Sequence, residues 1–120
     1  LLLCPHFDLR LLELWNRTQG QHTPFTLVTG YRSVTKKVKQ AHHDWLEMET
    51  VGGACHFVDR STALRAVMAM PSEPWEHTWD FQISRVYQQI IAPMRSFVQH
   101  LGIYGSGVNG ISDDVAFNYD

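Results

Sequence analysis

Two residues that can ligate a metal, Glu49 and His56, lie seven positions apart near the middle of the chain. Residues 50–55 between them include Gly52, Gly53 and an alanine, and such small residues allow backbones to approach closely and to bend. The flanking valine, cysteine and phenylalanine are typical of a strand. The segment therefore predicts a bent strand that turns both side chains toward one site. The alternative is a kinked core strand with one exposed Glu and one ordinary His.

Other residues with chemical potential lie on either side of this segment. A Gly-Tyr-Arg-Ser sequence places Arg32 just after the strand-like run 25–29, where loops often display functional groups. A short Glu-Pro-Trp-Glu-His stretch sets Glu76 beside His77. His42 and Glu49 are also seven positions apart, so they form a competing pair of metal ligands.

Composition limits the classes of function. The 120 residues predict a single domain, 1–120, and the absence of an initial Met is compatible with a piece of a longer protein. A net charge of −2 gives no electrostatic support for binding nucleic acid or an anionic membrane. No apolar run approaches the roughly 18 residues that a membrane span needs. Two cysteines define no disulfide framework.

The elements that must position these residues follow from hydrophobic periodicity. Apolar residues at helical spacing predict helices over 8–19, 62–70 and 77–101, the last kinked at Pro93. In the second helix we expect Leu64, Val67 and Met68 to face inward. Strand-like runs are 25–29, 50–58 and 115–119. The prediction is an α+β fold with a small antiparallel sheet flanked by helices.

Taken in order, these motifs resemble the zinc D-alanyl-D-alanine carboxypeptidase family, the peptidoglycan peptidases that share a fold with the hedgehog signalling domain. The family has a strand ending in Ser-Gly-Tyr-Arg-Ser, which residues 28–33 resemble. Its His-x-x-Gly-x-Ala-x-Asp motif is similar to residues 49–56, and its last strand, Phe-Val-His-x-Asp, is similar to residues 116–120. The resemblance covers most of the chain and implies the carboxypeptidase/hedgehog-like fold.

The resemblance also assigns the site residues. The three zinc-ligand positions of the family hold Glu49, His56 and Asn118 in this chain. Arg32 matches the arginine that would stabilise an oxyanion or hold a substrate carboxylate. The general base would be Glu76 or Asp120.

These substitutions weaken the expected metal site. Glu49 and His56 exchange the family's residue types, and Asn118 replaces an imidazole with a neutral amide, which is a poor zinc ligand. We therefore expect no zinc or weakly bound zinc, and a non-catalytic binding or structural module. Its partners would be peptidoglycan or other virion proteins, in a bacteriophage virion or the bacterial cell envelope. The alternative is an active zinc metallopeptidase, of carboxypeptidase or endopeptidase type, that cleaves cell-wall peptides.

Overall fold

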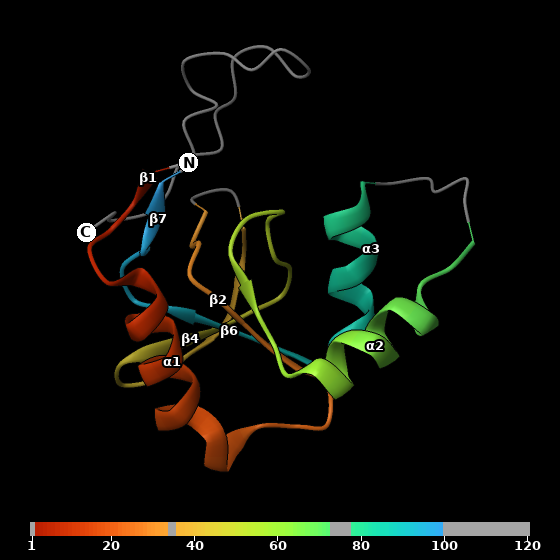
Figure 1. Ribbon diagram of the computed structural model, residues 1–120, viewed down its shortest axis with the longest axis horizontal. Helices are drawn as coiled ribbons and strands as arrows, with labels where there is room; N and C mark the ends of the chain where they lie inside the picture. The colour runs from red at the N-terminus through yellow and green to blue at the C-terminus, as the bar shows by residue number, and fades with distance from the viewer. Residues whose placement is uncertain (1, 34–35, 73–77, 100–120) are drawn as a thin grey trace.

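The computed structural model describes residues 2–33, 36–72 and 78–99. Helices and strands are mixed along the chain, so the coarse α+β class predicted from the sequence is confirmed (Figure 1). The elements are, in chain order, β1 (Leu2–Leu3), α1 (Phe7–Thr18), the 3-10 turn η1 (Gln19–Gln21), β2 (Thr26–Thr29), β3 (Val38–Ala41), β4 (Trp45–Met48), β5 (His56–Phe57), α2 (Arg60–Ala69), α3 (Trp79–Val86), β6 (Gln89–Pro93) and β7 (Val98–Gln99).

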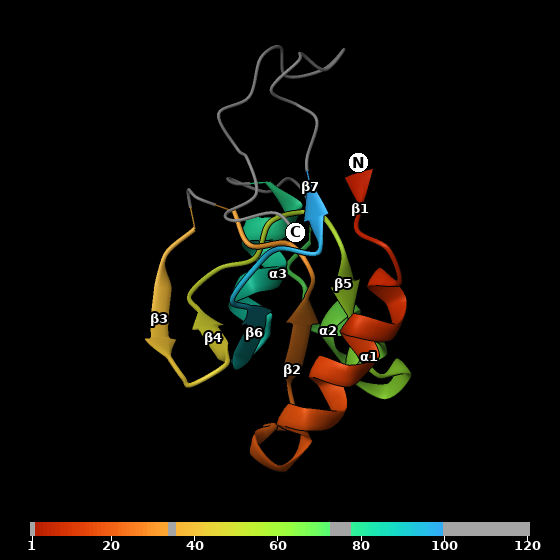
Figure 2. The same ribbon diagram turned by 90° about the vertical axis from the view of Figure 1, so that its left-hand side faces the viewer.

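A five-stranded sheet with the order β3-β4-β6-β2-β5 forms the centre of the domain (Figure 2). Two of its three inner strands, β2 and β6, run parallel to each other, with Leu27 opposite Ile90. The pairs β3–β4, β4–β6 and β2–β5 are antiparallel. The sheet is therefore mixed, and the prediction of an antiparallel sheet was wrong. A separate two-stranded sheet pairs β1 with β7.

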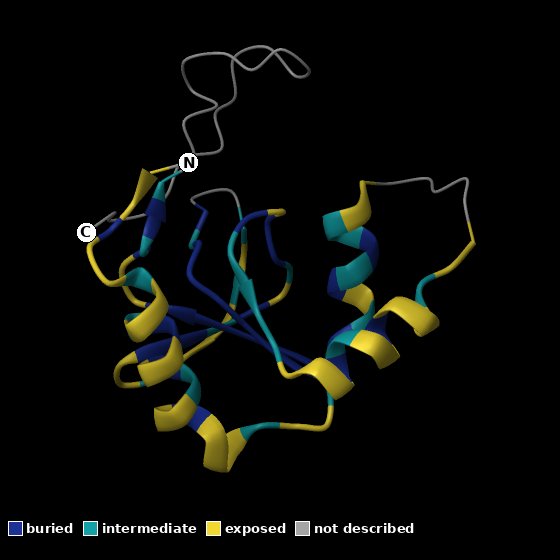
Figure 3. Ribbon diagram, in the orientation of Figure 1, coloured by how far each residue is buried: buried dark blue, intermediate teal, exposed yellow. Residues whose placement is uncertain are grey.

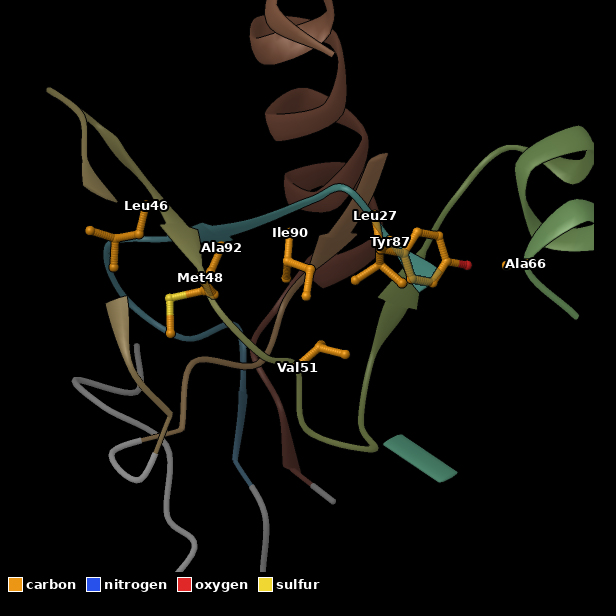
Figure 4. Packing of buried hydrophobic residues seen from close by; sticks show 8 residues of the cluster. All are labelled: Leu27, Leu46, Met48, Val51, Ala66, Tyr87, Ile90 and Ala92. Carbon is orange, nitrogen blue, oxygen red and sulfur yellow. The ribbon is translucent and has the colours of Figure 1, made fainter. Parts of the chain in front are cut away.

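The central strands are buried on both faces because helices cover each side. Successive residues alternate between the faces, so Leu27 and Ile90 join one cluster while Val28 and Ile91 join the other. One cluster contains Leu11 and Leu14 of α1 together with Val28, Trp45 and Ile91. The other contains Ala66 of α2 with Leu27, Leu46, Met48, Val51, Tyr87, Ile90 and Ala92 (Figure 4). The helices expose their outer surfaces (Figure 3).

The first two predicted helices are confirmed, as α1 and α2. The N-cap of α2 is Asp59, whose carboxylate accepts a hydrogen bond from the Thr62 backbone N–H at 2.9 Å. The predicted inward face of α2 was wrong, because Leu64, Val67 and Met68 are 56%, 68% and 86% exposed. The buried residues of α2 are instead the small Thr62 and Ala66, which let the helix lie close to the sheet.

The predicted helix 77–101 is confirmed over Trp79–Val86, which is α3, but it was wrong beyond Val86, where the chain continues as the central strand β6. Every residue of β6 is buried. A strand buried on both faces has a continuous apolar run, which periodicity cannot distinguish from a buried helix. Adjacent β-branched Ile90 and Ile91 favour the strand. Pro93 is the last residue of β6, so it ends a strand and does not kink a helix.

Residues 50–58 form a strand only at His56–Phe57, so the predicted strand was wrong over most of its length. Gly52, Gly53 and Ala54 lie outside the sheet. Cys55 has a φ of 59°, which is incompatible with extended backbone and separates the loop from β5. None of the predicted elements covers the β3–β4 hairpin. The predicted strand 115–119 lies outside the described residues.

Candidate functional site

Two loops meet where the parallel strands β2 and β6 end, the edge at which open parallel sheets commonly bind ligands. We call residues 30–33 and 94–97 the loop junction. The Phe97 backbone N–H donates to the carbonyl of Gly30 at 2.8 Å. The hydroxyl of Ser96, which is fully buried, accepts from the Arg32 N–H at 3.1 Å, and its one proton is shared between the Val98 carbonyl at 2.7 Å and the same Gly30 carbonyl at 3.1 Å. Hydrogen bonds therefore fix both loops relative to each other.

Arg32, the predicted oxyanion or carboxylate ligand, belongs to this junction. Its guanidinium Nη1 donates a hydrogen bond to the carbonyl of Met94 at 2.6 Å. Partial burial lowers the pKa of Arg32 from its usual value, but an arginine keeps its charge at any physiological pH. Arg32 therefore places a positive charge at the carboxyl ends of β2 and β6.

Gly30 joins the junction to the segment before β5. Its N–H donates to the carbonyl of Cys55 at 3.0 Å. A Cβ at Gly30 would lie 2.7 Å from the Cys55 sulfur and 3.3 Å from a methyl carbon of Leu11, so a larger residue would force these side chains to move. Burial raises the pKa of the Cys55 thiol, which keeps it protonated and unreactive near neutral pH.

His56 is held by the loop that precedes it. Its Nε2 lies 2.6 Å from the carbonyl oxygen of Gly52, and because a carbonyl only accepts hydrogen bonds, Nε2 must carry the proton. Burial is the main cause that lowers the pKa of His56, so the ring is neutral at pH 7. Its ring centroid is 5.6 Å from that of Trp79. A Cβ at Gly53 would lie 3.1 Å from Trp79, and one at Gly52 would lie 3.1 Å from Tyr31.

Glu49, the other described candidate ligand, has a different partner. Its carboxylate lies 3.0 Å from the Lys37 ammonium, and its backbone N–H donates to the Lys37 carbonyl at 3.0 Å. Glu49 follows β4, whereas His56 is in β5 at the far edge of the sheet. The remaining predicted site residues lie outside the described part of the chain: Glu76, His77, Asn118 and Asp120.

The alternative pair, His42 and Glu49, is separated by the length of the β3–β4 hairpin. The His42 N–H donates to the carbonyl of Trp45 at the closed end, and Glu49 pairs with Lys37 at the open end. The His42 ring stacks on Trp45 at 3.7 Å, and its Nε2 is buried with no hydrogen-bond partner among the described residues. Within residues 2–33, 36–72 and 78–99, no three His, Cys, Asp or Glu side chains group as a metal site.

A cleft that was not predicted from the sequence adjoins the junction, beside α1. We call it the arginine cleft; its volume is about 260 Å³, and its lining is Arg10, Glu13, Arg17, Asp44, Pro93, Met94, Arg95 and Phe97. The sequence contained one sign of this cleft. Arg10, Glu13 and Arg17 of α1 are three, four and seven positions apart, and residues at these spacings share one face of a helix. Met94, Arg95 and Phe97 could not be placed in the cleft from the sequence, because the strand β6 that precedes them was not predicted.

Comparisons with known proteins add no family to these observations. No family model matches the chain, and neither a curated protein nor a solved structure matches it. Among the described helices, none combines the length and the apolar character that crossing a membrane requires.

Proposed function

We propose that the chain is a divergent peptidoglycan-peptidase-like module with an impaired zinc site, which binds or holds other molecules and does not cleave them. Its partners are cell-wall peptides or other proteins of a bacteriophage virion. The ordered motifs of the sequence support the relationship to the peptidases. The hydrogen bond of His56 supports the impaired site.

The state of His56 carries this proposal. Zinc binds a lone pair on an imidazole nitrogen, but Nε2 of His56 holds a proton directed at the buried carbonyl of Gly52. Ligation through Nε2 would break this hydrogen bond and leave a buried carbonyl unpaired, at a cost of about 1–3 kcal/mol. Only Nδ1 would retain a lone pair. Together with an amide at position 118, this arrangement weakens the affinity for zinc.

Arg32 supports a binding role for the same edge of the sheet. A guanidinium can hold a carboxylate without any metal. The junction that carries Arg32 is fixed by backbone and Ser96 hydrogen bonds, and rigid loops lose little conformational entropy on binding. A peptide carboxylate at this edge is therefore the interaction that we expect to remain after catalysis is lost.

Zinc content and peptide release test this proposal. The full chain, purified without added metal, should contain far less than one zinc per molecule by elemental analysis. It should release no peptide from peptidoglycan that a chelator suppresses. Stoichiometric zinc with chelator-sensitive release would contradict the proposal and establish the alternative, an active zinc peptidase.

One substitution tests the correspondence with the family's ligand positions. Asn118→His restores the imidazole that the family has at that position, so it should increase the affinity for zinc. The matched control is Asn16→His, which adds a histidine at an exposed position of α1 and should leave the affinity unchanged. Equal affinities in the two variants would show that residue 118 is not a ligand position.

A further inference from the structure

Apolar side chains are exposed along the outer side of α2. Leu64, Val67 and Met68 are all more than half exposed. Residues three or four positions apart share one face of a helix, so these three form a single apolar surface. Arg60, the exposed first residue of α2, extends it by one turn. We call these four residues the α2 stripe. Several exposed apolar side chains on one face indicate a contact surface, whereas single ones do not.

The outer side of α1 carries a second surface of this kind. Leu9 and Leu12 are 59% and 43% exposed. Glu13 and Asn16 are exposed on the same face, and we call these four residues the α1 stripe. The two helices pack on opposite faces of the sheet, and their outer sides are exposed (Figures 1 and 3). The two stripes therefore point away from each other and cannot meet within one molecule.

The charges of the two stripes have opposite signs. The α2 stripe contains Arg60, and α2 has no Asp or Glu between its first and last residues. The α1 stripe contains Glu13. Contact between two α2 stripes or between two α1 stripes would bring like charges together, which opposes binding. Contact between an α1 stripe and an α2 stripe brings opposite charges together.

The spacing of the residues agrees with an antiparallel contact between the two helices. Arg60 lies four residues before Leu64, and Glu13 lies four residues after Leu9. Each interval is about 6 Å along the helix axis. Antiparallel helices therefore place Arg60 beside Glu13 when Leu64 lies beside Leu9. Parallel helices with the same leucine contact would place Glu13 beside the apolar Met68 instead.

We propose that the α1 stripe of one copy of this chain binds the α2 stripe of a second copy, with the two helices antiparallel. Each copy of a pair keeps one unused stripe on the opposite side of its sheet, so the contact is heterologous and repeats into a ring or a filament. Two short helices bury less surface than the standard interface of about 1,600 Å², so a single contact is weak. The inference does not depend on the proposed function, because neither stripe contains a candidate metal ligand.

Sedimentation velocity of the full chain tests the contact. Monomers at low concentration should give way to larger species as the concentration rises. Leu12→Asp and Leu64→Asp should each weaken association about tenfold or more, because each places a charge in an apolar contact. Leu2→Asp is the matched control, since it replaces a half-exposed leucine of β1 outside both stripes, and it should associate like the original chain. A monomer at every concentration, or equal weakening by the control, would overturn the proposal.

Mixing the two variants distinguishes a heterologous contact from a symmetric one. Leu12→Asp leaves the α2 stripe intact, and Leu64→Asp leaves the α1 stripe intact. Each variant alone should remain monomeric, whereas an equimolar mixture should form dimers and nothing larger, because one productive contact is left. Association of the Leu12→Asp variant with itself would show contact between two α2 stripes and would refute the proposal.

Reversal of charge tests the antiparallel arrangement. Glu13→Arg and Arg60→Glu should each weaken association severalfold, because each places like charges side by side. The double variant should associate like the original chain, since the pair is then restored with its signs exchanged. Failure of the double variant to recover would refute the antiparallel contact. Circular dichroism identical to that of the original chain shows that a variant has kept its fold.

Discussion

The loop junction and the arginine cleft share Met94, Arg95 and Phe97 but are built in opposite ways. In the junction, the polar groups of Gly30, Arg32 and Ser96 satisfy one another, and Ser96 is fully buried. In the cleft, charged side chains surround an open space, and the Arg17–Asp44 pair has side chains that are 43% and 45% exposed. The junction is thus packed around buried Gly30 and Ser96, whereas the ion pair of the cleft remains solvated.

This difference predicts which of the two regions has the larger effect on the stability of the domain. Closely packed regions respond strongly to small changes of volume, so the junction should determine how well the domain folds. Exposed charges contribute little to folding, so substitutions of the charged residues in the cleft should change the free energy of unfolding only slightly. The junction provides the rigid wall on which the cleft depends, because Met94, Arg95 and Phe97 belong to both.

The strongest way to test this comparison is to overfill the junction. Gly30→Ala places a Cβ 2.7 Å from the Cys55 sulfur and 3.3 Å from Leu11, so neighbouring atoms must move. We expect the free energy of unfolding to fall by about 2–3 kcal/mol, the upper range for overpacking. Urea denaturation followed by circular dichroism measures the change.

Two comparisons control that prediction. Gly20→Ala meets no atom within 4 Å, so its free energy of unfolding should remain within about 0.5 kcal/mol of the original. The double variant Gly30→Ala, Cys55→Ala should lose less than the sum of the single losses, because removal of the sulfur makes room for the new methyl. Strictly additive losses would show that the close approach to Cys55 is not the cause.

The sequence predicted elements whose pattern is local. The apolar positions of α1 recur at helical spacing, and its start and end fall within one residue of the prediction of 8–19. β6 could not be predicted in this way, because its burial depends on both β2 and β4. The outer face of α2 was misjudged for the same reason. Burial of Ala66 rather than Leu64 depends on the surface that the helix meets.

The candidate site could be predicted only in part for the same reason, because its geometry depends on contacts between segments that are distant in the sequence. The sequence singled out Arg32 and His56. Arg32 follows the carboxyl end of β2, and His56 lies in the neighbouring strand β5. It could not predict that His56 directs Nε2 at Gly52, because the direction of a ring depends on a loop bent by a positive φ at Cys55. The arginine cleft joins α1, the β3–β4 turn and the loop after β6, three segments that are distant in the sequence.

A smaller effect should come from the titration of His56. Burial lowers its pKa in the folded state, so between its unfolded value of about 6.5 and the folded value the unfolded chain binds more protons. The free energy of unfolding should therefore fall as the pH drops from 7 to 5, by at most about 1.4 kcal/mol per pH unit for this group. Denaturation at a series of pH values measures the slope.

Substitutions of single histidines show which side chain causes this dependence of the free energy of unfolding on pH. His56→Gln keeps an N–H donor for Gly52 but does not titrate, so it should show a shallower slope. Burial also lowers the pKa of His22, although the charge of the nearby Asp59 partly offsets this shift. His22→Gln should therefore remove a further part of the pH dependence of the free energy of unfolding. Asp59 itself titrates below this range, because hydrogen bonds from Thr62 lower its pKa. An unchanged slope in His56→Gln would contradict the prediction.

The smallest effect should come from the ion pair that spans the cleft. Arg17 and Asp44 are 3.0 Å apart but remain solvated, and such pairs contribute about 0.2–1 kcal/mol. A double-mutant cycle with Arg17→Ala and Asp44→Ala should give a coupling energy within that range, and it should shrink further at 1 M salt. A coupling above about 2 kcal/mol would mean that the pair is a structural element like the junction, and the distinction between the two regions would then fail.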